Sequence, residues 1–313
     1  LTKDAWFIGN NAEQKLKEKI ERIGKPLKEW DVKIYRGVLT GLNEAFIITT
    51  EKRNEILANC KGEDERKRTE AIIKPILRGR DIKRYYYDWA GLWVIVIPAG
   101  WTNENRRKEN AKDFFEKMFP TLMNYLKPFE SKAKKRDDQG DYWWELRACA
   151  YYPEFEKEKV VWQRITQEPT FCLVDKNTFV LDSMAFFVSN KNLKYQMAVL
   201  NSKAIFFYVN KIVHQYGFTG FRLSNQYVEI MPIPPITPAN EPIVHQIEDL
   251  VDKILAAKKQ DKDADTSQRE REIDLLVYKL YNLTYEEVKI IDPEIEKIIS
   301  KEEYEKFNEE IIR

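Results

Sequence analysis

The sequence has few residues of the kinds that bind metals or form disulfides. Its 313 residues include only three cysteines and two histidines. Cys60, Cys149 and Cys172 are odd in number and far apart, which argues against a disulfide framework and against a zinc knuckle. His214 and His245 have no Cys, His or acidic neighbour at the spacing of zinc ligands. We therefore expect three buried thiols and no metal site in this chain.

Long apolar runs are missing as well. No stretch approaches the ~20 apolar residues that cross a bilayer, and the N-terminus has no basic segment followed by an apolar one. We therefore expect a cytoplasmic protein without membrane contact. With 43% hydrophobic and 33% charged residues, the chain can bury one large core or two smaller ones. Because it begins at Leu1, we expect it to be a piece of a longer polypeptide.

Familiar catalytic and cofactor motifs are absent. No GxGxxG follows a predicted strand, and neither GxxxxGKS/T nor GxSxG occurs. Asp292, Glu294, Glu296 and Lys297 have a nuclease-like composition, but acids that follow Pro293 are typical of a first helical turn. A pair of carboxylates for sugar hydrolysis stays open among the 51 acidic residues. We assign no catalytic residue and no cofactor to this chain, and whether it is an enzyme stays open.

Charge is distributed unevenly, although the net charge is only +1. Residues 233–313 contain 20 acidic and 12 basic residues, whereas the preceding residues contain 40 basic and 31 acidic ones. A basic body followed by an acidic tail suggests that the body binds a polyanion and the tail does not. The alternative is that both are ordinary solvated surfaces.

Hydrophobic patterning predicts a mixed α/β (α+β) domain over residues 1–232, followed by an all-helical segment over 233–313. The proline-rich stretch 232–242 is interpreted as a stiff linker, and 131–141, with no apolar residue larger than Ala, as a mobile loop. Capping boxes are expected at Ser267 with Glu270 and at Thr284 with Glu287. Helices are expected over 12–23, up to Leu77, over 105–129 with a break at Pro120, over 193–211 and over 243–259, and strands over 32–37, 45–49, 92–98, 159–165, 170–175 and 184–189.

A dense basic stretch lies at residues 74–84. If the helix extends to Leu77, two of its basic residues share a face, and Gly79 then releases the chain into a turn that can approach a ligand. The alternative is that Asp81 pairs with an arginine and the other basic residues are merely solvated. We predict contacts with phosphate groups from five side chains: Lys74, Arg78, Arg80, Lys83 and Arg84.

A second cluster combines aromatic and polar residues around Gly217 and Gly220. Side chains of Arg, Asn and Gln can read base edges, and exposed aromatics can stack on bases. Core packing is the alternative for the aromatic residues. The turn VLTGLN, with Gly41 and Asn43, adds a smaller polar cluster. The predicted base-reading residues are Arg36, Thr40, Tyr216, Phe218, Thr219, Arg222, Asn225 and Gln226.

Six short sequence blocks, taken in their order along the chain, resemble the C-terminal specificity region of bacterial type IIG restriction-modification enzymes. In that family, this region is the TaqI-like target-recognition domain of DNA adenine-N6 methyltransferases. The resemblance spans almost the whole chain. The blocks are RGVLTGLNEAF (36–46), IIKPILRGRDIKRY (72–85), DYWWELR (141–147), VLNSK (199–203), IMPIP (230–234) and EIDLLVYKLYNLTYEEV (272–288).

The resemblance implies which residues correspond to family motifs. In the family, an upstream methyltransferase domain holds S-adenosylmethionine and an Asn-Pro-Pro-aromatic motif, often with a nuclease domain further upstream; no such tetrapeptide occurs here. Recognition loops vary in the family, so base-reading residues are not implied. The residues that correspond to the TG-N turn and to the LRGRDI-Y block are Thr40, Gly41 and Asn43, and Gly79, Arg80, Asp81 and Tyr85.

We therefore expect a non-catalytic module that recognises a sequence in double-stranded DNA beside upstream methyltransferase and nuclease domains. The acidic helices are expected to lie away from the duplex, packed on the body, on those domains or on a second copy as a homodimer. Two alternatives stay open. One is a carbohydrate-active or carbohydrate-binding protein that uses the eight tryptophans, and the other is a helical assembly subunit.

Overall fold

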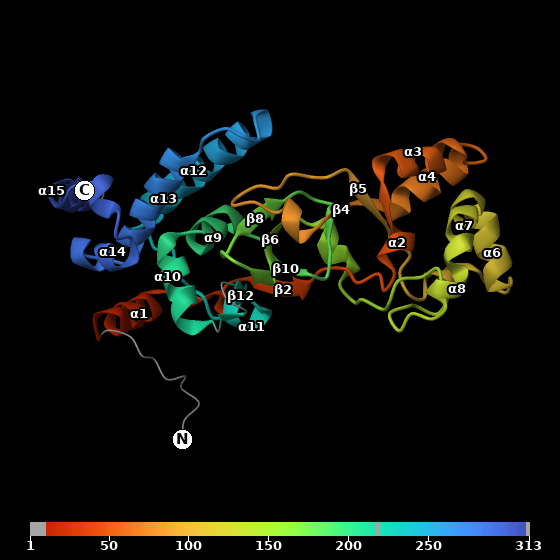
Figure 1. Ribbon diagram of the computed structural model, residues 1–313, viewed down its shortest axis with the longest axis horizontal. Coiled ribbons are helices and arrows are strands. Elements are labelled where there is room, and N and C mark those ends of the chain that lie inside the picture. The colour runs from red at the N-terminus through yellow and green to blue at the C-terminus, as the bar shows by residue number, and fades with distance from the viewer. Residues whose placement is uncertain (1–10, 214, 217–219, 311–313) are drawn as a thin grey trace, which may run out of the picture.

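The computed structural model describes residues 11–213, 215–216 and 220–310. It is elongated, with a sheet near the middle, helices α12 to α15 at one end and α3, α4, α6 and α7 at the other (Figure 1). The α-helices are α1 Asn11–Ile23, α2 Asn43–Phe46, α3 Thr50–Ala58, α4 Glu63–Ile72, α5 Trp101–Asn105, α6 Ala111–Met118, α7 Pro120–Leu126, α8 Glu130–Ala133, α9 Leu193–Leu200, α10 Lys203–Ile212, α11 Asn225–Val228, α12 Glu241–Gln260, α13 Ser267–Leu280, α14 Tyr285–Ile291 and α15 Lys301–Glu310.

The strands form four small sheets in the described part of the chain, ordered β1-β13, β2-β10-β6-β8, β11-β12-β7 and β3-β5-β4-β9. Together with the helical C-terminal region, they confirm the predicted mixed α/β class. The strands are β1 Lys25–Pro26, β2 Val32–Arg36, β3 Ile47–Thr49, β4 Ile73–Leu77, β5 Leu92–Ile95, β6 Lys159–Gln163, β7 Ile165–Thr166, β8 Phe171–Val174, β9 Phe179–Val180, β10 Met184–Ser189, β11 Gln215–Tyr216, β12 Gly220–Arg222 and β13 Pro232–Ile233.

The antiparallel sheet β2-β10-β6-β8 separates two hydrophobic cores and contributes to both. Alternate residues of a strand point to opposite faces. In β6, Val160 and Trp162 therefore belong to one core and Val161 to the other, and in β10 Phe187 and Phe186 divide in the same way. Burial on both faces explains why these strands are nearly continuous apolar runs rather than alternating ones.

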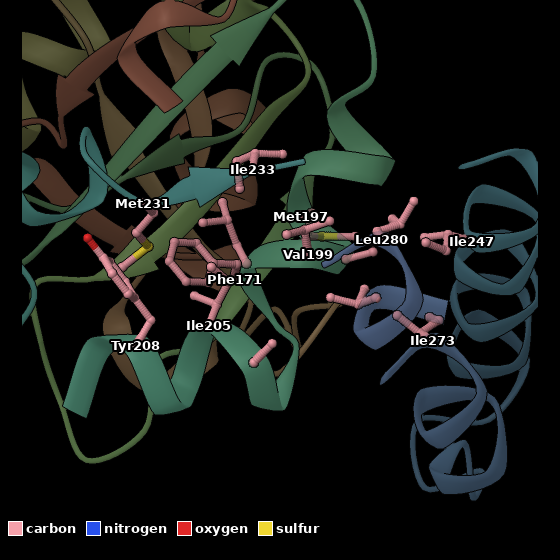
Figure 2. Close-up of a cluster of buried hydrophobic side chains, with 14 of the residues drawn as sticks. Phe171, Met197, Val199, Ile205, Tyr208, Met231, Ile233, Ile247, Ile273 and Leu280 are labelled. Atoms are coloured by element: carbon pink, nitrogen blue, oxygen red, sulfur yellow. The ribbon is translucent and has the colours of Figure 1, made fainter. Parts of the chain in front are cut away.

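The first core joins the body to the C-terminal helices. Figure 2 shows Ile247 of α12 and Ile273 of α13 beside residues of α9, with Phe171 of β8 and Ile233 of β13 in the same cluster. The segment expected to be a linker begins with Pro232 and Ile233, which pair with β1 as a strand. The acidic tail therefore packs on the body, which is one of the three arrangements expected from the sequence. The division at residue 232 remains a prediction.

The structure differs from several local expectations. Residues 73–77 are strand β4 rather than helix, because Pro75 cannot donate an amide hydrogen bond and disfavours helical geometry at Lys74. The segment 131–141, expected to be a mobile loop, contains Arg136, whose side chain is buried. Its guanidinium donates hydrogen bonds to the carbonyl oxygens of Thr40, Trp143 and Glu145 at 2.5, 2.8 and 2.6 Å.

Helix ends mostly follow their sequence signals. Pro120 begins α7, and Thr284 with Glu287 forms the expected capping box. The expected helix over 193–211 is broken, because Ser202 caps a new helix, α10, after α9 has ended. The second expected capping box, at Ser267 with Glu270, does not form. The N-cap is Thr266, which makes no side-chain capping hydrogen bond and whose hydroxyl instead donates to Glu270 at 2.7 Å, and Ser267 is already helical.

Candidate functional site

Some of the residues singled out by sequence lie at one end of the central sheet, and others lie elsewhere in the fold. At this end β2 finishes with Arg36 and β6 with Gln163, while β8 starts at Phe171 and β10 at Met184. Strand register brings these four ends together: Ala185 faces Arg36 on one side of β10, and Met184 faces Gln163 on the other. Phe171, Met184 and Ala185 are buried in the two cores, whereas Arg36 and Gln163 are partly or fully exposed and border the solvent at this end.

Three arginines meet at this end from three different strands or strand ends. Arg36 ends β2, Arg164 follows β6, and Arg222 ends β12, where it faces Ile165 of β7. Burial lowers the pKa of Arg164, and the positive charges of Arg36 and Arg222 lower it further, with Asp182 as the opposing acid. The positive charges of Arg36 and Arg222 thus both repel that of Arg164.

A cavity of about 220 Å³ opens beside this cluster. Arg36, Arg164 and Asp182 line it, together with Arg147 and Tyr151. Arg147 is partly neutralised by an ion pair with Asp138 at 3.2 Å. The cavity is therefore predominantly cationic, with an aromatic wall.

The RGRD turn lies against the same strand end. A Cβ atom at Gly79 would lie 3.1 Å from Oε1 of Gln163, so the turn approaches the end of β6 closely. Arg78 does not point freely toward solvent, because its guanidinium binds Asp81 at 2.8 and 3.1 Å. The alternative considered in the sequence analysis, that Asp81 pairs with an arginine, therefore holds for Arg78. Arg80 is exposed and has no side-chain partner among the described residues, whereas Lys83 donates to the carbonyl oxygen of Arg80 at 3.3 Å.

The other two residues of the basic stretch lie in different surroundings. Lys74 is half-buried within β4, where it faces Val94 of β5. Arg84 connects the body to α13, since its guanidinium donates to the carbonyl oxygen of Asn201 at 2.8 Å and pairs with Glu270 at 3.1 Å. Phosphate contact by these residues remains a prediction, and Arg84 already has acidic partners within the chain.

The second predicted cluster is only partly described. Arg222 and Gln226 are exposed, and Asn225 starts the short helix α11. The side-chain oxygen of Asn225 is buried and has no hydrogen-bond partner in the described part of the chain. Phe218 and Thr219, and the side chain of Tyr216, lie outside the described residues.

Thr40 is fully buried, so its side chain does not face a ligand here. Its hydroxyl donates to Asn43 at 2.5 Å and accepts from the amide of Leu42 at 3.2 Å. Gly41 has φ +68°, the left-handed conformation that glycine adopts without strain. The buried guanidinium of Arg136 holds the turn to residues 143–145, and burial lowers the pKa of Arg136 to about 10.

Two residues of the site were missed from the sequence. Arg164 and Ile165 end the segment KVVWQRI, which was noted only as a strand. Ile165 is 52% exposed, more than any other large hydrophobic side chain that the structure describes as exposed. One feature of the sequence could have identified them. The polar pair Gln163 and Arg164 interrupts an apolar strand and marks the place where the strand leaves the core.

Other kinds of site find little support. Over residues 11–213, 215–216 and 220–310, no group of three or more His, Cys, Asp and Glu side chains is arranged to hold a metal ion. Cys172 is buried, but Cys60 and Cys149 are only half-buried, so the expectation of three buried thiols was wrong for two of them. In the same part of the chain, no helix has the length and apolar composition needed to cross a membrane.

Comparison with known proteins identifies similar sequences and folds. The family model described as the TaqI-like C-terminal specificity domain matches residues 74–233. Among solved structures, the chain is similar to the type IIL restriction-modification enzyme MmeI in complex with DNA, with 13% identity, a TM-score of 0.57, and coverage of 91% of this chain and 37% of that one. The type IIG restriction endonuclease BpuSI matches with 11% identity, a TM-score of 0.48, and coverage of 87% and 33%. No curated protein matches the sequence.

The matched region contains most of the site. Residues 74–233 include the RGRD turn, Arg164, Arg222 and α11, but not Arg36. The chain spans little more than a third of the length of MmeI, with 37% of that chain covered.

Proposed function

This chain belongs to the family of the TaqI-like C-terminal specificity domain, and we propose that it recognises a sequence in double-stranded DNA as the specificity region of a restriction-modification protein. The observation that carries the proposal is the meeting of Arg36, Arg164 and Arg222 at one end of the central sheet. Clustered arginines of this kind attract a polyanion. The similarity to MmeI, whose solved structure is a complex with DNA, also supports the proposal.

The residues divide into two proposed roles. Contacts to phosphate oxygens fix the position of a protein on DNA, whereas contacts to base edges select the sequence. Arg80 and Lys83, which are exposed at the RGRD turn, are proposed to contact phosphates. Asn225 and Gln226 are proposed to read bases, because amide side chains bind adenine through paired hydrogen bonds. Ile165 joins them as an exposed apolar residue that can contact the methyl group of thymine.

The wider assignment is also a proposal. We place the chain next to upstream methyltransferase and nuclease domains. The upstream methyltransferase is proposed to bind S-adenosylmethionine and to methylate adenine at N6. The short coverage of MmeI, 37% of its chain, is consistent with such missing domains. A homodimer through the C-terminal helices would have to use other surfaces, because the apolar stripe of α12 is buried within the chain.

Selection from a randomised duplex library tests sequence recognition. We expect the wild-type chain to enrich a short motif, because a correct bidentate pair contributes about 1 to 3 kcal/mol of discrimination. Arg80→Ala should weaken all duplexes alike, whereas Asn225→Ala and Gln226→Ala should each relax single positions of the motif. Binding without any enriched motif would refute sequence recognition.

A carbohydrate-related function is the second reading from the sequence. Trp143, Trp144 and Trp162 are buried, and among the described tryptophans only Trp89 is exposed, at 38%. A sugar platform normally needs an exposed ring, so this reading has little structural basis. Salt-independent binding of an oligosaccharide would favour it over DNA binding.

A further inference from the structure

Arg164 lies in surroundings that disfavour its own charge. Its guanidinium makes one long contact, from Nη1 to the carbonyl oxygen of Asp182 at 3.5 Å. Its Nε atom is buried and has no hydrogen-bond partner among the residues that the structure describes. Arginine remains protonated in proteins, so the half-buried guanidinium of Arg164 has a buried Nε–H donor that lacks an acceptor.

Two neighbouring arginines make the surroundings of Arg164 still less favourable for its positive charge. Arg36 and Arg164 line the same cavity, and Arg222 faces Ile165, the residue next to Arg164. Both arginines lower the pKa of Arg164 through repulsion, and the single carboxylate of Asp182 opposes them. Asp182 can offset only one of three positive charges, so the cluster is unfavourable until an anion arrives.

We propose that Arg36, Arg164 and Arg222 together bind one phosphodiester group of the DNA backbone, with Arg164 as the central donor. The inference rests on the proposed function and adds a specific site to it. A guanidinium fork matches the geometry of a phosphate, and hydrogen bonds between charged groups are about twice as strong as neutral ones. A bound phosphate would give the Nε–H of Arg164 its missing acceptor and offset the repulsion of Arg164 by Arg36 and Arg222.

A base edge fits the cluster less well than a phosphate does. Base edges carry no net charge, so they would leave the repulsion that Arg36 and Arg222 exert on Arg164 unrelieved. This assigns Arg36 and Arg222, predicted from the sequence to be base readers, to the backbone instead. The cavity of about 220 Å³ lets an anion reach Arg36 and Arg164 from solvent.

Salt dependence of duplex binding tests the inference. Each phosphate that a protein neutralises contributes about 0.9 to the slope of log affinity against log salt. Because the cluster binds one phosphate, the triple variant Arg36→Gln, Arg164→Gln, Arg222→Gln should lose about 0.9 of the slope, and Arg164→Gln alone most of that amount. The matched control is Arg271→Gln, which removes one exposed positive charge from α13 and should leave the slope unchanged.

Three results would overturn the inference. A slope equal to that of Arg271→Gln would show that the cluster touches no phosphate. A loss near 2.7 in the triple variant would show three separate phosphate contacts, at about 0.9 for each. A relaxed sequence preference with an unchanged slope would show that these arginines read bases.

Stability without DNA separates a binding role from a structural one. A structural arginine loses partners when it is replaced, so its variant melts at a lower temperature. Because Arg164 lacks a close partner and is repelled by its neighbours, Arg164→Gln should melt at or above the wild-type temperature. A clearly lower melting temperature would contradict the inference.

Failure of the proposed function can be told apart from failure of the phosphate site. If the wild-type chain binds no duplex even at low salt, the proposed function fails. The cluster is then judged by titrating inorganic phosphate into the ¹⁵N-labelled chain. The Nε–H signal of Arg164, assigned by its absence in Arg164→Gln, should shift and saturate with phosphate but not with chloride at equal ionic strength. No shift overturns the site.

Discussion

At the scale of single residues, the basic stretch 74–84 contains side chains with different partners. Arg78 is held by Asp81 inside its own turn, and Arg84 is held by Glu270 of α13. Arg80 is exposed at the tip. The sequence indicated that basic residues concentrate here. It could not indicate which of them are already paired, because the partner of Arg84 lies almost 190 residues further along the chain.

Replacement of Arg84 and Arg80 should therefore have different effects. Arg84→Ala removes one of the two cations near Asp274, which is 4% exposed and keeps Lys203 nearby, and should lower the free energy of unfolding by roughly 1 to 3 kcal/mol. The loss in free energy of unfolding should not exceed the upper value of this range, because the side chain of Arg84 is 35% exposed and solvent weakens its ion pairs. Arg80→Ala should change stability by less than about 0.5 kcal/mol and weaken duplex binding.

Urea denaturation of both variants checks this pair of predictions. The result that contradicts the assignment is equal stability of Arg84→Ala and Arg80→Ala. A second contradiction would be a loss of duplex binding by Arg84→Ala that remains after the unfolded fraction has been taken into account.

At the scale of elements, the family blocks turn out to be parts that bind one another. Arg136 joins the turn of the first block to residues 143–145 of the third. Asn201, in VLNSK, exchanges two hydrogen bonds with the backbone of Phe171 at 2.8 and 2.9 Å and so extends the edge of β8. Asp274, in the last block, accepts from the amide of Lys203 at 2.9 Å. The recognisable blocks thus form a framework, while Asn225 and Gln226, which are proposed to read bases, lie between two of them.

Strand β6 begins with a buried lysine that makes stability depend on pH. Lys159 is fully buried, and burial lowers its pKa to about 7, although Asp175 and Glu158 oppose the shift. Between that value and the unfolded value near 10.5, the unfolded chain binds a proton that the folded chain does not, so stability rises with pH.

Comparison of the wild type with Lys159→Met isolates this effect. The free energy of unfolding of the wild type, relative to the variant, should increase by on the order of 1 to 2 kcal/mol between about pH 7 and pH 9. Thermal or urea denaturation at both pH values measures it. A difference between the two proteins that does not change with pH would show that Lys159 stays charged in the folded state.

At the scale of the whole molecule, the sequence predicted the class, the helical C-terminal region and the family, and the family was confirmed by the match over residues 74–233. It did not predict that the acidic tail neutralises part of the basic body. Ion pairs join Lys19 to Glu287 and Lys194 to Asp252, both at 2.6 Å. Net charge alone cannot reveal such pairing, because it depends on which surfaces meet in the fold.

The shared core predicts that the body does not fold without the C-terminal helices. A chain that ends at residue 240 lacks α12 to α15 and uncovers Met197 and Val199, which are buried in the core shared with those helices. We expect this fragment to aggregate or to lose cooperative unfolding, measured by circular dichroism and light scattering. A fragment that unfolds cooperatively, like the full chain, would instead support two independent domains divided near residue 232.

The salt dependence of duplex binding by the wild-type chain tests the central claim most directly. With the phosphate site around Arg164 and one contact each from Arg80 and Lys83 at the RGRD turn, three phosphates give an expected slope of log affinity against log salt of about −2.7. Titrations of a mixed-sequence duplex at 50, 100 and 200 mM salt, roughly the range over which such slopes are resolved, provide the measurement. Tight binding that weakens steeply across this series is the predicted result. Absence of binding at the lowest salt, or affinity that does not change with salt, would contradict the account.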